Sequence, residues 1–166
     1  RHSAASPFQK ETMSDDITFN IHEAHAHFAT EYFNKTREYI GKGSKRSVED
    51  NQTMLHAAIA SLFHWSQRTD AKPENLAIGY WQVSRVYNLI QQPNNARTYG
   101  LLSLQYAKDL KPLYRAYAYE TLARAEMLCN NRVIMLVHLE KARALAAQIE
   151  EEEDQQLLLS DLGTII

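Results

Sequence analysis

The sequence is poor in the residues that interrupt helices and in the residue that cross-links chains. Its 166 residues include five glycines, four prolines and a single cysteine, Cys129. One cysteine excludes an intramolecular disulfide framework and suits a reducing compartment. The scarcity of Gly and Pro favours helices, and the lack of long alternating β-branched runs argues against sheets. Because Cys129 ends an expected helix with no cation beside it in sequence, we expect a buried, inert thiol.

The chain also lacks a concentration of positive charge and a long apolar run. Its net charge is −2, and Lys and Arg gather on no face or tail, which argues against nucleic-acid binding. No stretch approaches the roughly 18 apolar residues that span a bilayer, and no signal peptide is visible. Residues 1–12 contain no Met, so we interpret them as a non-native leader and Met13 as the natural start. These features predict a cytoplasmic protein without nucleic-acid or membrane partners.

What the sequence does contain is a regular helical pattern. The hydrophobic content of 45% and charged content of 23% are typical of one globular domain, here residues 13–166. Ser47 and Asp50 resemble a capping box, Pro73 suits a first helical turn, and Asn94 or Asn95 is expected to cap the fourth helix. About seven helices follow, and short connections make neighbours antiparallel. The expected hairpins are 17–69, 74–110 and 113–149, followed by a C-terminal cap at 151–166.

Positions 39 residues apart resemble one another, which indicates a structural repeat. Tyr80, Val83, Ser84 and Tyr87 precede Tyr119, Leu122, Ala123 and Glu126 at this offset. Ala96, Gly100, Ser103 and Ala107 precede Met135, Leu139, Ala142 and Ala146 in the same way. Subtracting 39 from the positions of Ala96, Gly100, Ser103 and Ala107 predicts their equivalents in the second helix, in the same order: Ala57, Ser61, His64 and Arg68. It fails for the first helix.

The pattern resembles the tetratricopeptide repeat. Tyr80, Val83-Ser84 and Tyr87 are similar to that family's first-helix signature, and the small residues of 96–107 to its second-helix face. The resemblance implies an all-α fold of antiparallel hairpins stacked as a short right-handed superhelix. The period departs from the family's usual 34 residues, and Glu126 stands where an aromatic is expected. Segments 62–65 and 79–87 also resemble uncharacterised bacterial proteins, which implies no activity. A plain antiparallel bundle with Ala-rich seams is the alternative.

The resemblance implies an inner groove lined by the first helix of each hairpin. Its predicted partner-binding residues are Trp81, Arg85, Asn88, Tyr117, Glu120 and Arg124. Aromatic and Arg side chains of this kind dominate binding hot spots, and the Arg fork matches carboxylates. The leading hypothesis is a non-catalytic protein-interaction scaffold that binds a peptide or a partner helix in a concave groove. In the alternative, Trp81 packs against the first or second helix and Arg85 pairs with Glu120 in a polar seam.

No catalytic or cofactor motif accompanies these residues. Ser61, Ser84 and Ser103 lie in mid-helix without the Gly-x-Ser-x-Gly turn, and no His-Glu-x-x-His or Cys cluster is present. We therefore expect no catalytic residue, metal or cofactor. The alternative function is a small-molecule or metal site around His56, His64, Trp65 and Arg85.

The C-terminal segment is the last feature that the sequence leaves open. It contains five large apolar side chains that would otherwise be exposed to solvent: Leu157, Leu158, Leu162, Ile165 and Ile166. They predict either a capping helix or a homodimer formed through this helix.

Overall fold

The computed structural model describes residues 19–166, so the interpretation of residues 1–12 and of Met13, and the expected start of the first hairpin at residue 17, lie outside it. Within this range the chain is all-α, with no strand. The helices are α1 (Ile21–Gly41), α2 (Val48–Ser66), α3 (Pro73–Leu89), α4 (Pro93–Ala107), α5 (Pro112–Leu128), α6 (Arg132–Ala146) and α7 (Glu152–Leu162), with a 3-10 turn at Gly43–Lys45.

Helix starts follow local side-chain chemistry. The predicted capping box is confirmed, because the Ser47 hydroxyl accepts from the Asp50 amide and the Asp50 carboxylate accepts from the Ser47 amide. The Asn20 side chain accepts from the amides of His22 and Glu23 and so caps α1. These bonds use backbone donors that a helix cannot satisfy internally.

Prolines open three of the helices. Pro73, Pro93 and Pro112 occupy the first turns of α3, α4 and α5. Proline suits this position because its fixed φ is helical and the missing N–H has no intrahelical partner there. The prediction for Pro73 is confirmed. The prediction that Asn94 or Asn95 caps α4 is wrong, because the helix already begins at Pro93 and its N-cap is Gln92.

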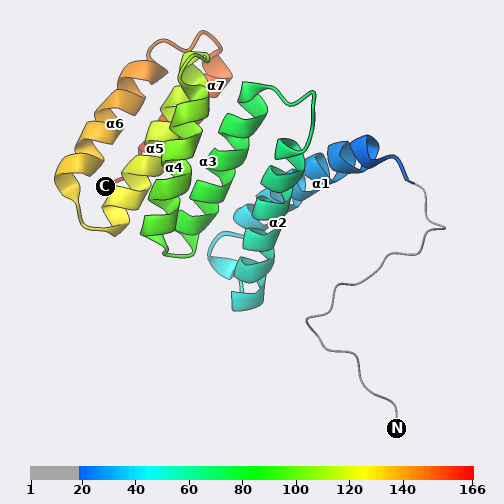
Figure 1. Cartoon of the computed structure of the whole chain (residues 1–166). Coiled ribbons are helices and arrows are strands. Elements are labelled where there is room, and N and C mark those ends of the chain that lie inside the picture. The colour runs from blue at the N-terminus through cyan, green and yellow to red at the C-terminus, as the bar shows by residue number, and fades with distance from the viewer. Residues whose placement is uncertain (1–18) are drawn as a thin grey trace.

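The helices stack as antiparallel hairpins. α1 packs on α2, α3 on α4 and α5 on α6, neighbouring hairpins lie side by side, and α7 packs against α5 and α6 (Figure 1). The first two hairpins each contain an equivalent hydrogen bond between their two helices. The Ser103 hydroxyl donates to the Ala77 carbonyl at 2.9 Å, and the Ser61 hydroxyl donates to the Ala29 carbonyl at 2.7 Å. The bond ties the second helix of a hairpin to its first.

These bonds correct the repeat frame at the first hairpin. The 39-residue offset carries Ala77 and Ser103 to Ala116 and Ala142, which share one core in the third hairpin. In the first hairpin Ser61 takes the place of Ser103 and not, as the frame predicted, that of Gly100. The predicted positions of His64 and Arg68 are therefore wrong. Both are only half-buried, whereas Ser103 and Ala107 are buried, although His64 still contacts His25 of α1.

The close approach of α4 to α5 requires a glycine. Gly100 is buried, and a Cβ built on it would lie 2.9 Å from Cδ2 of Leu122, which is itself 1% exposed. Separations this short are repulsive, so a larger residue would force the Leu122 side chain or one of the two helices to shift. Gly100 therefore fixes the spacing of two consecutive hairpins.

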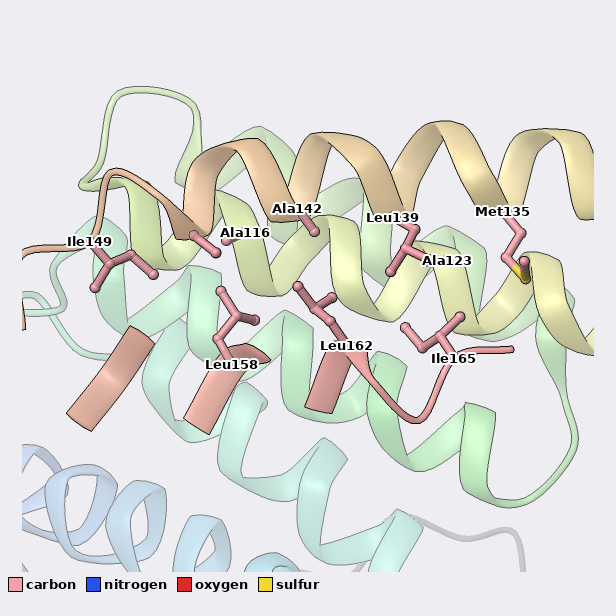
Figure 2. Close-up of a cluster of buried hydrophobic side chains, with 10 residues drawn as sticks. Ala116, Ala123, Met135, Leu139, Ala142, Ile149, Leu158, Leu162 and Ile165 are labelled. Atoms are coloured by element: carbon pink, nitrogen blue, oxygen red, sulfur yellow. The ribbon is translucent and has the colours of Figure 1, made fainter. Parts of the chain in front are cut away.

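The C-terminal segment covers the last hairpin. Leu158, Leu162 and Ile165 are buried and point toward Leu139, Met135 and the other core residues of α5 and α6 (Figure 2). Leu157, Leu159 and Ile166 remain exposed. The segment acts as a cap on its own chain. A homodimer through α7 stays a prediction. Of the apolar residues in this segment, Leu157, Leu159 and Ile166 are exposed and could contact a second copy.

Cys129 differs from its expected environment. The thiol is exposed, and Nη2 of Arg97 lies 3.3 Å from its Sγ. Arg97 also donates to Glu126 at 2.6 Å, and Asn131 donates to the same carboxylate. Glu126 stands where the resemblance implies an aromatic, and it is nearly fully buried. The Arg97–Glu126 ion pair links the second and third hairpins. The prediction of a buried thiol is wrong.

Candidate functional site

The main cavity opens on the side of the first helices of the hairpins. Its volume is about 520 Å³. Four helices contribute to its walls, namely α1, α3, α5 and α7. Most of the lining is apolar or aromatic: Phe33, Arg37, Ile40, Gly41, Ala77, Ile78, Trp81, Gln82, Leu113, Tyr114, Tyr117, Asp154 and Leu157. A concave, largely apolar site with few polar groups is the usual form of a binding site.

Two of the six predicted partner-binding residues line this cavity. Trp81 and Tyr117 are both half-buried, and their rings meet edge to face with centroids 5.2 Å apart. The Trp81 indole donates from Nε1 to Glu120 Oε2 at 3.2 Å. This bond fixes the plane of the indole and leaves part of the ring in the cavity wall. Trp81 and Tyr117 thus provide a rigid aromatic floor.

The next two predicted residues form a buried ion network with Glu120. The Glu120 carboxylate, 1% exposed, accepts from Nε of Arg124 and lies 4.0 Å from Nη1 of Arg85. Arg124 also donates from Nη2 to the Asp161 carbonyl and the Thr164 hydroxyl, each at 2.8 Å. One carboxylate therefore links α3 and α5, and Arg124 extends the link to α7.

Burial shifts the protonation of groups around this network. Loss of solvent lowers the pKa of Arg85, which the Glu120 charge partly offsets. Burial also raises the pKa of Tyr117 well above its ordinary value. The pKa of Asp161 is raised first by burial and then by the charge of Glu120. A second negative charge beside Glu120 is thus disfavoured.

The remaining predicted residue does not line the cavity. Asn88 is buried and donates from Nδ2 to the Thr121 carbonyl and hydroxyl, both at 3.0 Å. It joins α3 to α5. Trp81 and Tyr117 therefore line the cavity, while Arg85, Asn88, Glu120 and Arg124 connect helices beside it. The alternative polar seam is also partly present, because Arg85 approaches Glu120.

Sequence reasoning missed both borders of the cavity. Phe33, Arg37 and Ile40 come from α1, while Asp154 and Leu157 come from α7. Spacing within the helix could have identified Leu113 and Tyr114, which lie about one turn before Tyr117. The borders carried no comparable signal, because the 39-residue offset applies to neither α1 nor α7.

The four residues of the alternative site have separate contacts. His56 is exposed on α2, and Trp65 lies beneath the Arg68 guanidinium at 4.4 Å. Nδ1 of His64 lies 2.8 Å from Nδ1 of His25, and Arg85 belongs to the Glu120 network. None of the four lines the main cavity. Among residues 19–166, no group of three or more His, Cys, Asp or Glu side chains is placed to hold a metal ion.

The His25–His64 contact predicts a pH-dependent stability. Burial, and then the charge of His25, lowers the pKa of His64. The unfolded chain therefore binds a proton more readily, so the stabilisation is present above the ordinary histidine pKa and is lost as the pH falls through the lowered value. Urea unfolding between pH 7.5 and 5 should show this loss, and His64→Gln, which cannot titrate, should reduce it. An equal pH dependence in the variant would contradict the assignment.

The fold and the cavity together define a class: an all-α protein of stacked helical hairpins with an open cavity on one side. No protein-family model, curated protein or solved structure matches the chain. No helix in the described range combines the length and the apolar character needed to cross a bilayer.

Proposed function

We propose that the chain is a non-catalytic, tetratricopeptide-like interaction protein that binds a peptide segment in the main cavity. The observation that carries this proposal is the cavity of about 520 Å³, whose walls include Trp81, Tyr114, Tyr117 and Leu157. Leu157 is 59% exposed although three other apolar residues of the same segment are buried. Such large apolar side chains gain free energy when a partner covers them.

The arrangement of the floor supports binding of a flexible partner. Trp81 is held by Glu120, and the Glu120 carboxylate is held by Arg124 and approached by Arg85. The site is therefore organised before a partner arrives, which reduces the entropy cost of binding. Among residues 19–166, no set of nucleophilic and basic side chains converges in the cavity, so this lining supports binding in preference to catalysis.

Selection from a phage-displayed library of random 12-residue peptides tests the proposal. We expect peptides with large apolar residues to be enriched on the wild-type protein and to lose most of their binding to Leu157→Gln. The matched control is Leu159→Gln, because Leu159 is also exposed on α7 but does not line the cavity. Equal retention by both variants, or no enrichment on the wild type, would reject the proposed function.

A further inference from the structure

The main cavity has one charged residue at each of two opposite borders. Among residues 19–166, Arg37 of α1 and Asp154 of α7 are the only charged residues that line it. α1 belongs to the first hairpin and α7 packs on the third, so the floor made by α3 and α5 separates them (Figure 1). A ligand lying across this floor would meet a positive group at one end and a negative group at the other.

Arg37 occupies the same repeat position as the two arginines of the buried network. The Ser61–Ala29 and Ser103–Ala77 bonds place Ala29 and Ala77 at one level. Eight residues further along each helix are Arg37 and Arg85, and the 39-residue offset leads from Arg85 to Arg124. The first helices thus carry three equivalent arginines.

Only two of these arginines are engaged. Arg85 and Arg124 face the Glu120 carboxylate. Arg37 is exposed, and within residues 19–166 its side chain makes no ion pair or hydrogen bond. A guanidinium is a planar fork of donors that matches a carboxylate. Arg37 is therefore placed to bind a carboxylate of the ligand, as its two equivalents bind that of Glu120.

The negative border extends beyond the main cavity. A second cavity of about 340 Å³ shares Leu113, Tyr114 and Asp154 with it and is also lined by Lys111, Pro112, Gln148, Ile149, Glu150 and Glu151. Glu150 and Glu151 are exposed. The ammonium of Lys111 lies 3.9 Å from Glu151, and both side chains are largely solvent-exposed. This ion pair is therefore weak and leaves Glu151 able to bind another cation. Three carboxylates thus face one ammonium at this end.

From these charges we propose the chemistry of the partner. It is a peptide segment with a fixed charge order: an acidic side chain against Arg37, an apolar side chain in the main cavity, and a Lys or Arg side chain against Asp154, Glu150 and Glu151. Opposite charges at the borders favour this order, and the reverse order would place like charges together. This inference rests on the proposed peptide binding and adds the direction in which the segment lies.

Matched peptides test the charge order. The probes are the tightest-binding peptide from the library selection and a copy in which its acidic and basic residues are exchanged. At low salt we expect the exchanged peptide to bind the wild type at least about threefold more weakly, as measured by fluorescence polarisation. In Arg37→Glu and in Asp154→Lys the difference should shrink or invert. If a charge-reversal variant destabilises its helix, the test can use Arg37→Gln or Asp154→Asn, each of which removes the charge without reversing it.

Control variants separate local charge from net charge. Lys35→Glu changes the net charge as Arg37→Glu does, and Glu140→Lys does so for Asp154→Lys, yet neither residue lines a cavity with Arg37 or Asp154. Both controls should keep the wild-type preference. Equal affinities of the two probes, or a preference that the border variants leave unchanged, would overturn the charge order while leaving Leu157-dependent binding intact. Loss of that binding itself would reject the proposed function instead.

Discussion

Replacing Glu120 with alanine should lower the free energy of unfolding by about 3–5 kcal/mol. The carboxylate is 1% exposed and lies between the guanidinium groups of Arg85 and Arg124. Its removal leaves two positive charges facing each other, with Arg124 7% exposed and the Arg85 side chain 20% exposed. It also removes the hydrogen-bond acceptor of the Trp81 indole. Urea denaturation monitored by circular dichroism measures the change.

The control for this experiment is Glu140→Ala on the exposed surface of α6. It removes the same charge, and we expect a change within about 0.5 kcal/mol. Similar losses in the two variants would contradict the central role of Glu120. Tryptophan fluorescence adds a second measurement, because Trp81 loses its carboxylate acceptor while Trp65 keeps its contact with Arg68.

The helices could be predicted from the sequence because their signals are local. Capping at Ser47 and the proline at position 73 depend on residues within one turn. The 39-residue offset works from α3 to α6 because those two hairpins have helices of matching length. Local chemistry and repeated geometry therefore predict the same elements there.

The borders of the site could not be predicted from local signals. α1 and α2 are joined by residues 42–47, whereas residues 90–92 join α3 to α4, and α1 has 21 residues against 17 in α3. A single offset therefore cannot find Arg37 from Arg85. Asp154 reaches the cavity because α7 packs back against α5, which is a tertiary contact. The cation beside Cys129 was likewise missed, because Arg97 is 32 residues away in the sequence.

Two neighbouring leucines on α7 should respond in opposite ways to the same substitution. Leu158 is fully buried in the core formed with α5 and α6, so Leu158→Ala should cost about 2–5 kcal/mol of stability through lost burial and the cavity left behind (Figure 2). Leu157 is 59% exposed and lines the main cavity. Leu157→Ala should change stability by less than about 0.5 kcal/mol and should weaken binding of the selected peptides.

Chemical denaturation and peptide binding, measured on both variants, separate the two roles. Hydrogen exchange adds a local measurement, since Leu158→Ala should accelerate exchange throughout α7 by weakening its attachment to α5 and α6. Equal stability of the two variants would mean that α7 does not cap the last hairpin in solution. In that case Asp154 and Leu157 would lose their fixed position at the cavity border. The attachment of α7 through Leu158 is therefore a precondition for the proposed binding site.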